Sequence, residues 1–461
     1  MMLSTAFSFA QVDITGDWNG MLDFQGIMKM RIIFHIQEKD GAYTATLDSP
    51  DQNAYGIPTG SVVYGFPELE IDMPDLRAHF KGTLVHDGTG ISGTFTQAGQ
   101  ALLLELGRKA IEKEVLNRPQ EPKPPFPYNE EEVTFENKAA GITLAGTLTL
   151  PKKEGKCPVV ILVSGSGPQD RNEELLGHKP FLVIADHLTR QGIGVLRYDD
   201  RGVGKSTGKF STATSKDFAS DALAAVDYLR TRKEIDKKQI GIAGHSEGGL
   251  IAPMCAAQSK KVAFIILLAG PGVDGEEVVL TQTELIDRAE GYSDAKIQSD
   301  LEMNRKAFQL MRSEPDTAKL RPQLVALFEE AIKAMPEEER KEIGDISAYA
   351  NQQASQLASP WFLYFLQYDP KTALEKVKCP VLALNGEKDL QVEPKINLAG
   401  IEEALKKGGN KHYQIEELPG LNHLFQECTT GSPTEYARIE QTFSPQALKL
   451  MSDWIWKTVG K

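Results

Sequence analysis

The sequence IGIAGHSEGGLIAPM (residues 240–254) joins a short apolar run, a glycine-rich turn and a second run of small and apolar residues. The first run predicts a buried strand and the second a helix. Ser246 lies in the turn between them. Gly244, Gly248 and Gly249 have no Cβ, so they let the strand and the helix approach closely. Such a turn lifts a serine hydroxyl above the end of a strand, which is typical of a nucleophile.

The pattern G-x-S-x-G occurs a second time, as GKSTG at 204–208, so context must decide between the two serines. The second match lies several residues beyond its predicted strand, and no helix of small residues follows it at once. We therefore predict that Ser206 is a loop residue and that Ser246 is the nucleophile. The amide of Glu247 opens the predicted helix, where it can face a developing negative charge.

A serine nucleophile needs a base, and the base needs a residue that orients it. After a strand–serine–helix turn of this kind, the acid follows the next-to-last strand and the histidine follows the last one. The loop GEKDLQV (386–392) offers Asp389, with Glu387 as the alternative. His412 opens the predicted last strand, whereas His423 lies in the loop beyond it. We predict Asp389 as the orienting acid and His423 as the base.

The loop SGSGPQDRN (164–172) follows the apolar run CPVVILVSG and can supply a second donor to an oxyanion. Its glycines permit a turn that aims backbone N–H groups inward. We predict the amide of Ser166 as this donor, with Gly167 as the next choice.

Two other interpretations of the glycine-rich loops fail at single positions. A dinucleotide-binding fingerprint in GSGPQD would require glycine where Asp170 stands. A P-loop ending in GVGKST would require glycine where Asp199 stands. We therefore expect no nucleotide cofactor, and we predict instead that Arg201 pairs with a carboxylate beside the site.

Composition excludes several classes of partner and cofactor. The net charge of −13 argues against binding to nucleic acid, and no run of 18 apolar residues is present that would span a membrane. The cysteines show no metal-ligand spacing, so we expect free thiols and no metal. His35, His79 and His86 are expected to be ordinary structural or surface histidines.

A chain of 461 residues exceeds one ordinary core, and the hydropathy pattern divides it into five parts. We predict a signal-peptide remnant (1–10), an all-β domain (11–113), a proline-rich linker (114–131), an α/β core (132–270 and 371–461) and a helical insertion (271–370). The remnant ends in Ser8-Phe9-Ala10, before a cleavage at Gln11. The all-β domain is expected to be a sandwich or barrel, with a hairpin turn at Asp40-Gly41. The remnant favours a periplasmic or secreted protein, with the cytoplasm as the alternative.

Strands and helices alternate in the predicted core, which indicates a mostly parallel, doubly wound sheet. The insertion 271–370 carries 19 acidic and 10 basic residues and is expected to cap the active site. Its aromatic cluster WFLYF (361–365) could line an acyl pocket, although core packing is the favoured role for most of it.

Six motifs together resemble serine esterases of the α/β-hydrolase superfamily, in particular bacterial carboxylesterases related to prolyl-oligopeptidase-like and acyltransferase-like hydrolases. They are GSGPQDRN (165–172), HKPFLVIADHL (178–188), VLRYDDRGVGKSTG (195–208), GHSEGG (244–249), NGEKDLQV (385–392) and LNHLF (421–425). The resemblance covers most of residues 132–461 and implies the same triad of Ser246, Asp389 and His423. Some members of this group also carry an N-terminal β domain.

We therefore expect a metal-free serine hydrolase that cleaves carboxylic esters of small to medium acyl groups. Three alternatives stay open: a peptidase with the same triad, an acyltransferase or thioesterase, and a catalytically idle binding protein. The expected partner is a small-molecule ester, and the β domain could narrow access, bind substrate or support a homodimer.

Overall fold

The computed structural model describes residues 12–24, 28–52, 54–85, 88–97, 100–112, 117–153, 155–337, 340, 343 and 345–460. Two compact units are formed, one by Met1–Val115 with Ala318–Ser355 and the other by Leu116–Thr317 with Gln356–Lys461. The expected insertion thus contributes helices to both units. The predicted signal remnant 1–10, its cleavage position Gln11 and His86 lie outside the described residues.

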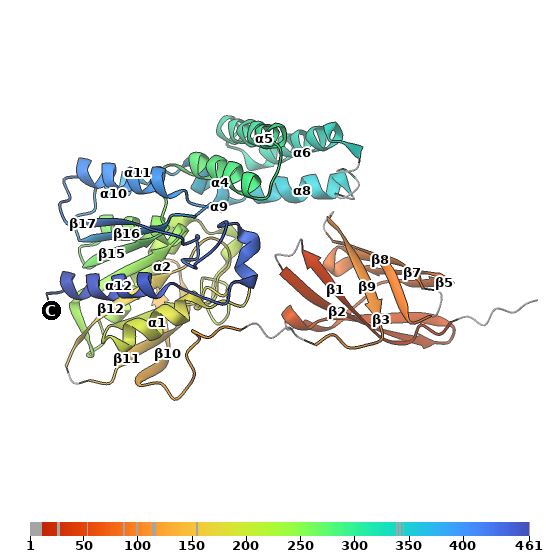
Figure 1. The fold of residues 1–461 in the computed structure, drawn as a ribbon, viewed down its shortest axis with the longest axis horizontal. Helices are drawn as coiled ribbons and strands as arrows, with labels where there is room; N and C mark the ends of the chain where they lie inside the picture. Colours follow the sequence, from red (N-terminus) through yellow and green to blue (C-terminus); the bar gives the residue numbers. More distant parts are fainter. Residues whose placement is uncertain are drawn as a thin grey trace, which may run out of the picture. The chain divides into compact units, whose positions relative to one another are not determined.

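The N-terminal unit contains an antiparallel sheet of nine strands in the order β4-β3-β2-β1-β9-β8-β7-β6-β5 (Figure 1). Asp40 and Gly41, both with positive φ, join β2 to β3, so the predicted hairpin turn is confirmed. The strands are β1 (Gly16–Phe24), β2 (Met28–Lys39), β3 (Ala42–Ser49), β4 (Ala54–Pro58), β5 (Val62–Gly65), β6 (Glu68–Met73), β7 (Ala78–Leu84), β8 (Gly90–Gln97) and β9 (Gln100–Gly107).

Alternating side chains of this sheet form a core of their own around Trp18 and Phe34, which are fully buried. The indole of Trp18 donates to the carbonyl of Ile14 (2.8 Å), and the guanidinium of Arg108 stacks over its ring at 3.7 Å. These contacts of Trp18 anchor the first strand, β1.

The second unit is built on an eight-stranded sheet in the order β10-β11-β13-β12-β14-β15-β16-β17. The strands β10, β11 and β13 are antiparallel neighbours, and from β13 to β17 the pairing is parallel. The strands are β10 (Tyr128–Asn137), β11 (Ile142–Pro151), β12 (Cys157–Val163), β13 (Gly194–Tyr198), β14 (Ile235–His245), β15 (Phe264–Leu268), β16 (Val381–Gly386) and β17 (Tyr413–Leu418).

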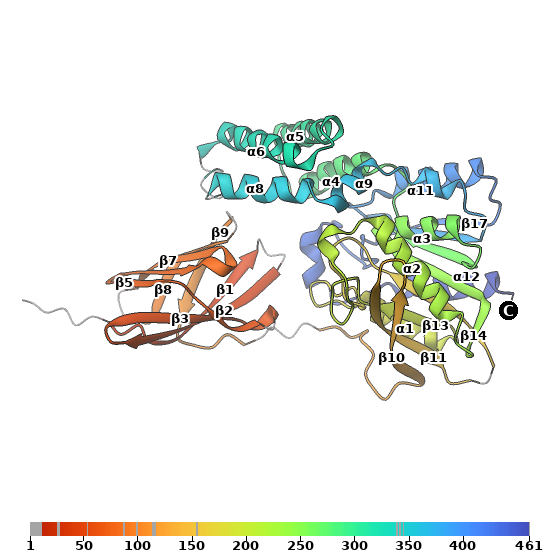
Figure 2. The ribbon, with the colours of Figure 1, turned by 180° about the vertical axis from the view of Figure 1, so that it is seen from behind.

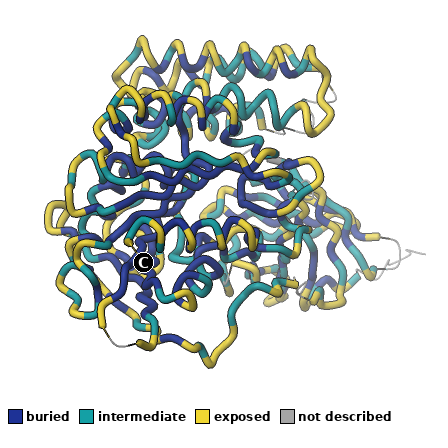
Figure 3. The backbone as a smooth tube through the Cα atoms, turned by 60° about the vertical axis from the view of Figure 1, so that its left-hand side comes forward, coloured by how far each residue is buried: buried dark blue, intermediate teal, exposed yellow. Residues whose placement is uncertain are grey.

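Helices cover both faces of this sheet, which Figures 1 and 2 show from opposite sides. On one face, α1 (Pro180–Arg190) and α12 (Pro445–Thr458) pack on the side chains of Val160, Leu162 and their neighbours. On the other face, α2 (Ser215–Leu229), α3 (Glu247–Gln258) and α11 (Pro394–Lys407) pack on Val159, Ile161 and theirs. The central strands are buried on both sides, which explains their unbroken apolar runs (Figure 3).

The linker differs from its prediction at one end, because β10 begins at Tyr128, within the expected range 114–131. Its polar run is an edge strand with one exposed face, so composition alone resembles a linker there. Before it, Arg118 donates to the carbonyls of Ala437 (3.0 Å) and Ile439 (2.9 Å). This stretch is therefore held on the second unit by specific bonds.

The insertion 271–370 is helical, as predicted. The side chains of Asp274 and Ser293 cap α4 and α5 by accepting from backbone amides. Phe365 packs with Leu250 and Val278, so part of the aromatic cluster serves packing. Its described helices include α4 (Gly275–Ala289), α5 (Asp294–Ser313), α6 (Thr317–Ala334), α8 (Ile346–Leu357) and α9 (Pro360–Gln367), and α10 (Lys371–Leu374) follows the insertion.

Candidate active site

The strand–turn–helix motif forms around Ser246 with the backbone that a nucleophile elbow requires. Ser246 has φ 52° and ψ −115°, between the end of β14 and the start of α3. A side chain at Gly244 would place its Cβ 1.9 Å from the carbonyl oxygen of Gly248, and one at Gly248 would lie 2.0 Å from that of Val163. These two glycines are therefore required by close backbone approach. Strain of this kind in a non-glycine residue is concentrated at functional sites.

The backbone amides around Ser246 differ in their hydrogen bonds. The N–H of Ser246 donates to Leu268 (2.8 Å), and that of Gly249 donates to the carbonyl of Ser246 (2.8 Å). Glu247 is the first residue of α3, so its amide has no acceptor within the helix. This is the amide that the sequence predicts as an oxyanion donor.

Asp389 and His423 come together from loops after β16 and β17. The Nδ1 of His423 lies 2.8 Å from Oδ2 of Asp389, and both side chains are buried. The other carboxylate oxygen accepts from the amides of Gln391 (2.8 Å) and Val392 (2.9 Å). A carboxylate that accepts on both oxygens favours a proton on Nδ1 of the imidazole. The Nε2 of His423 is then unprotonated, as a general base requires.

The alternative residues have other contacts. Oε2 of Glu387 accepts from the amide of Gly420 (2.8 Å) on the exposed side of the loop. His412 precedes β17, and its amide donates to Asn410 (2.8 Å). The structure brings neither side chain to His423 among the residues it describes.

His423 lies against His245, the residue that precedes Ser246. The rings of His245 and His423 are 4.8 Å apart between centroids, and Nε2 of His245 donates to the carbonyl of His423 (3.0 Å). Ser246 Oγ itself forms no hydrogen bond to His423 within the described part of the chain. Such bonds are often long in unliganded enzymes and shorten when substrate binds.

The loop after β12 lies beside Ser246. A Cβ added at Gly165 would lie 3.2 Å from Cβ of Ser246. Ser166 is exposed, and its carbonyl accepts from the side chain of Gln169 (3.2 Å). The carboxylate of Asp200 fixes both ends of the turn in this loop, because it accepts from Oγ of Ser164 (3.1 Å) and from the amide of Gln169 (3.0 Å). Burial raises the pKa of Asp200 well above its usual range.

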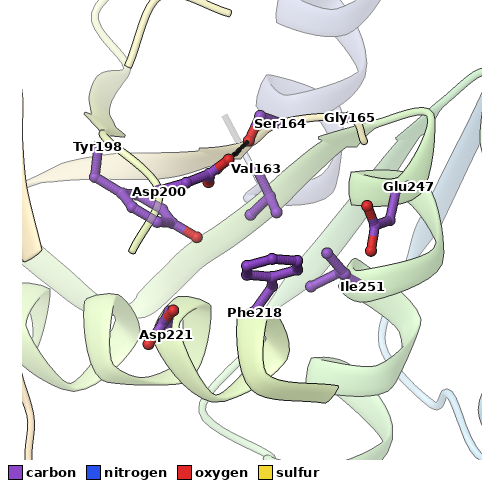
Figure 4. Close-up of a pocket in the computed structure, with 9 residues that line it drawn as sticks. All are labelled: Val163, Ser164, Gly165, Tyr198, Asp200, Phe218, Asp221, Glu247 and Ile251. Carbon is purple, nitrogen blue, oxygen red and sulfur yellow. Dashed lines mark hydrogen bonds between the residues drawn. The ribbon is translucent and has the colours of Figure 1, made fainter. Parts of the chain in front are cut away.

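A small cavity lies behind the elbow, and Figure 4 shows Asp200 and Glu247 among the residues around it. Oε1 of Glu247 accepts from Oγ of Ser215 (2.6 Å) and from the indole of Trp361 (2.8 Å). Glu247, which follows Ser246, is therefore hydrogen-bonded to Trp361 of α9, at the end of the helical insertion. The full lining is Val163, Ser164, Gly165, Tyr198, Asp200, Phe218, Asp221, Glu247 and Ile251.

Glu247→Gln is expected to make thermal stability less dependent on pH. Burial raises the pKa of Glu247 from 4.5 to about 7, so the folded protein keeps this proton to higher pH than the unfolded chain does. Folding stability must therefore fall as pH rises between these values. We expect Tm to fall less for the variant than for the wild type between about pH 5 and pH 8. Equal falls in the two proteins would contradict this prediction.

The second G-x-S-x-G serine is structural. Oγ of Ser206 donates to the carbonyl of Asp199 (2.7 Å) and accepts from the amide of Ala145 (2.9 Å). In the same segment Nε of Arg201 lies 2.7 Å from Oδ2 of Asp221, so its predicted pairing with a carboxylate is confirmed.

Several functional-site neighbours were not predicted from the sequence. Glu173 contacts His245, and Trp361 contacts Glu247, each from a distant segment of the chain. In the motif G-x-S-x-G, His245 occupies a variable position, so the motif assigned it no role.

In the N-terminal unit, His35 lies between the carboxylates of Asp17 (2.7 Å) and Asp48 (3.0 Å), which its sequence position does not reveal.

Other features of the chain bear on its chemistry. The cysteines form no disulfide bonds; they are Cys157, Cys255, Cys379 and Cys428. Within the described ranges, no three His, Cys, Asp or Glu side chains are grouped so as to hold a metal ion. Of the helices in those ranges, none combines the length and the hydropathy needed to cross a membrane.

A family model described as serine aminopeptidase, S33, matches residues 179–427, a span that includes Ser246, Asp389 and His423. The chain belongs to this family. Its membership, together with the sheet topology, shows the α/β-hydrolase fold. The resemblance inferred from the six motifs is thereby confirmed.

Relatives of this S33-family chain include esterase EstD of Thermotoga maritima, 27% identical over 307 residues that make up 66% of this chain and 64% of that protein. The putative hydrolase YtaP of Bacillus subtilis is 34% identical over 155 residues, which are 30% of this chain and 51% of that protein. The matched regions thus span less than two thirds of either relative. Among solved structures, the α/β hydrolase GrgF from Penicillium sp. sh18 is 17% identical, with a TM-score of 0.46 over 73% of this chain and 100% of that one.

Proposed function

We propose that the protein is a serine hydrolase that cleaves carboxylic esters of small to medium acyl groups through an acyl-enzyme on Ser246. The observation that carries the proposal is the buried Asp389–His423 pair, which leaves Nε2 of His423 as an acceptor beside the elbow. The name of the relative EstD, an esterase, supports the choice of ester substrates.

In the proposed reaction, His423 takes the proton of Ser246 as its hydroxyl attacks the ester carbonyl. The amides of Glu247 and Ser166 bind the oxyanion of the tetrahedral intermediate. The imidazolium, stabilised by Asp389, then gives its proton to the leaving alcohol. His423 then takes a proton from water as the water attacks the acyl-enzyme carbonyl. The bond to Oγ of Ser246 breaks, the proton returns to Oγ, and the carboxylic acid is released.

The rest of the chain is assigned roles that follow from this chemistry. We propose that the insertion 271–370 limits the size of the acyl group, and that Trp361 is part of the wall near the nucleophile because it bonds to Glu247. The β domain 11–113 could restrict access or support a homodimer.

A second candidate is cleavage of peptides, because the matched family model is described as a serine aminopeptidase. The same triad attacks either substrate, since esters and amides pass through similar tetrahedral intermediates. Neither a triad nor a fold by itself decides between them.

A panel of substrates separates the two candidates. We expect p-nitrophenyl esters from acetate to octanoate to be hydrolysed with an optimum at short or medium length, and aminoacyl p-nitroanilides to be turned over at least about 100-fold more slowly in kcat/KM. Faster cleavage of the anilides would make the protein a peptidase instead. Transfer of the acyl group to added alcohol or thiol in preference to water would indicate an acyltransferase.

A further inference from the structure

Glu173 and His245 lie outside the predicted triad, yet they form a buried polar chain through the site. Oε1 of Glu173 accepts from the amide of Gly165 (2.6 Å) and from Nδ1 of His245 (3.0 Å). Nε2 of His245 donates to the carbonyl of His423 (3.0 Å). The chain thus connects the predicted oxyanion loop, the nucleophile elbow and the loop of the base.

The hydrogen bonds of His245 define its charge. Its Nε2 faces a carbonyl, which only accepts, and its Nδ1 faces a carboxylate oxygen that also receives an amide proton. Both ring nitrogens are therefore donors, as in the imidazolium form. Burial alone lowers the pKa of His245, but the charge and the hydrogen bond of Glu173 raise it above its ordinary value.

This pair is costly to the fold. Glu173 and His245 are buried, and Oε2 of Glu173 has no hydrogen-bond partner among the described residues. Glu173 also adopts φ 51°, a left-handed conformation that a residue with a side chain rarely takes. Buried ion pairs seldom stabilise a protein more than apolar residues of the same size would. Backbone strain and unsatisfied buried polar atoms are typical of functional sites.

The contacts of Glu173 and His245 indicate what this pair contributes to the site. Gly165 immediately precedes Ser166, His245 immediately precedes Ser246, and the third contact is with the main chain of His423 itself. Each member of the pair therefore acts next to a residue of the proposed machinery. A shift of about 1 Å between such groups can reduce catalysis about 100-fold.

We propose that the Glu173–His245 ion pair is a positioning device that fixes the oxyanion loop and the base relative to Ser246. The proposal rests on the proposed function, because it assigns these residues a role in the reaction of Ser246. It predicts that replacing the imidazolium of His245 lowers kcat, most of all where the bond to the carbonyl of His423 is lost, and leaves KM nearly unchanged.

Substitutions of His245 can break one contact at a time. In His245→Asn the amide nitrogen replaces Nδ1, so the contact with Glu173 is kept and the bond to the carbonyl of His423 is lost. In His245→Gln the amide nitrogen replaces Nε2, so the bond to His423 is kept. His178→Asn is the matched control: His178 is also buried, and its Nε2 donates to the carbonyl of Tyr436 (2.9 Å).

The experiment measures kcat and KM for p-nitrophenyl acetate, together with the rate at which a fluorophosphonate labels Ser246. We expect His245→Asn to lower kcat and the labelling rate about 100-fold with KM within about threefold. His245→Gln should recover at least about tenfold of that loss, and His178→Asn should stay within about threefold of the wild type. Far-UV circular dichroism and Tm establish that each variant is folded.

If His245→Asn does not fold, Glu173→Gln takes its place, because it keeps an oxygen for the amide of Gly165 and removes the charge. A folded variant of either kind with wild-type kcat would overturn the proposal, as would an equal loss in His178→Asn. In these cases the wild type still reacts at Ser246, so the proposed function stands. A wild type that fails to react with both reagents rejects the proposed function and, with it, this inference.

Discussion

Ser246→Ala is expected to lower kcat for ester hydrolysis about 10⁶-fold, to the level that binding and oxyanion stabilisation alone can sustain. The loss is this large because alanine has no oxygen to form the acyl-enzyme, and the remaining groups of a triad cannot replace a nucleophile. The measurement is kcat and KM of the purified variant on the best ester of the panel. KM should change little.

Ser206→Ala is the matched control, because Ser206 occupies the same position in the second G-x-S-x-G match. Its hydroxyl bonds only to the backbone of Asp199 and Ala145, so its removal should affect stability and not the chemical step. Full activity in Ser246→Ala, or loss of activity confined to Ser206→Ala, would reject the nucleophile that we propose.

The second large effect is expected for Asp389→Asn, with a fall in kcat of about 10⁴-fold. An amide at this position can present its N–H₂ to Nδ1 of His423, which would stabilise the tautomer protonated on Nε2. That tautomer cannot accept the proton of Ser246. The carboxylate also accepts from the amides of Gln391 and Val392, so Tm of the variant must be measured alongside its activity.

Glu387→Gln provides the comparison for Asp389→Asn, since it removes the alternative carboxylate from the same loop. We expect it to keep activity within about threefold, because its oxygen bonds only to the amide of Gly420 at the exposed side of the loop. An equal fall for both variants would show that the loop, and not the acid itself, had been disturbed.

Local patterns in the sequence were sufficient to predict most of the second unit. Continuous apolar runs such as residues 157–163 and 264–268 are strands buried on both faces, and each lies where its run predicts. The glycines around Ser246 indicated the elbow because close backbone approach leaves no room for a Cβ there. The order of Ser246, Asp389 and His423 then led to loops that follow β14, β16 and β17.

Sequence patterns did not predict several of the contacts between residues that lie far apart in the chain. Glu173 and His245 are 72 residues apart, and Trp361 lies 114 residues from Glu247, so no spacing rule connects either pair. Local patterns also missed strands β4 and β5, which are short and contain no buried residue, and strand β6, although its Leu69, Ile71 and Met73 are buried. The beginning of β10 was hidden for a related reason, since the polar residues of an edge strand resemble those of a linker.

The most direct test of the central claim is a crystal structure of the protein after reaction with ethyl methylphosphonofluoridate, which loses fluoride as its phosphorus bonds to a nucleophile. We predict phosphorus bonded to Oγ of Ser246, the phosphonyl oxygen about 2.7–3.1 Å from the amides of Glu247 and Ser166, and the ring of His423 turned toward Oγ. Phosphorus on another residue, or a phosphonyl oxygen that faces neither amide, would contradict the account.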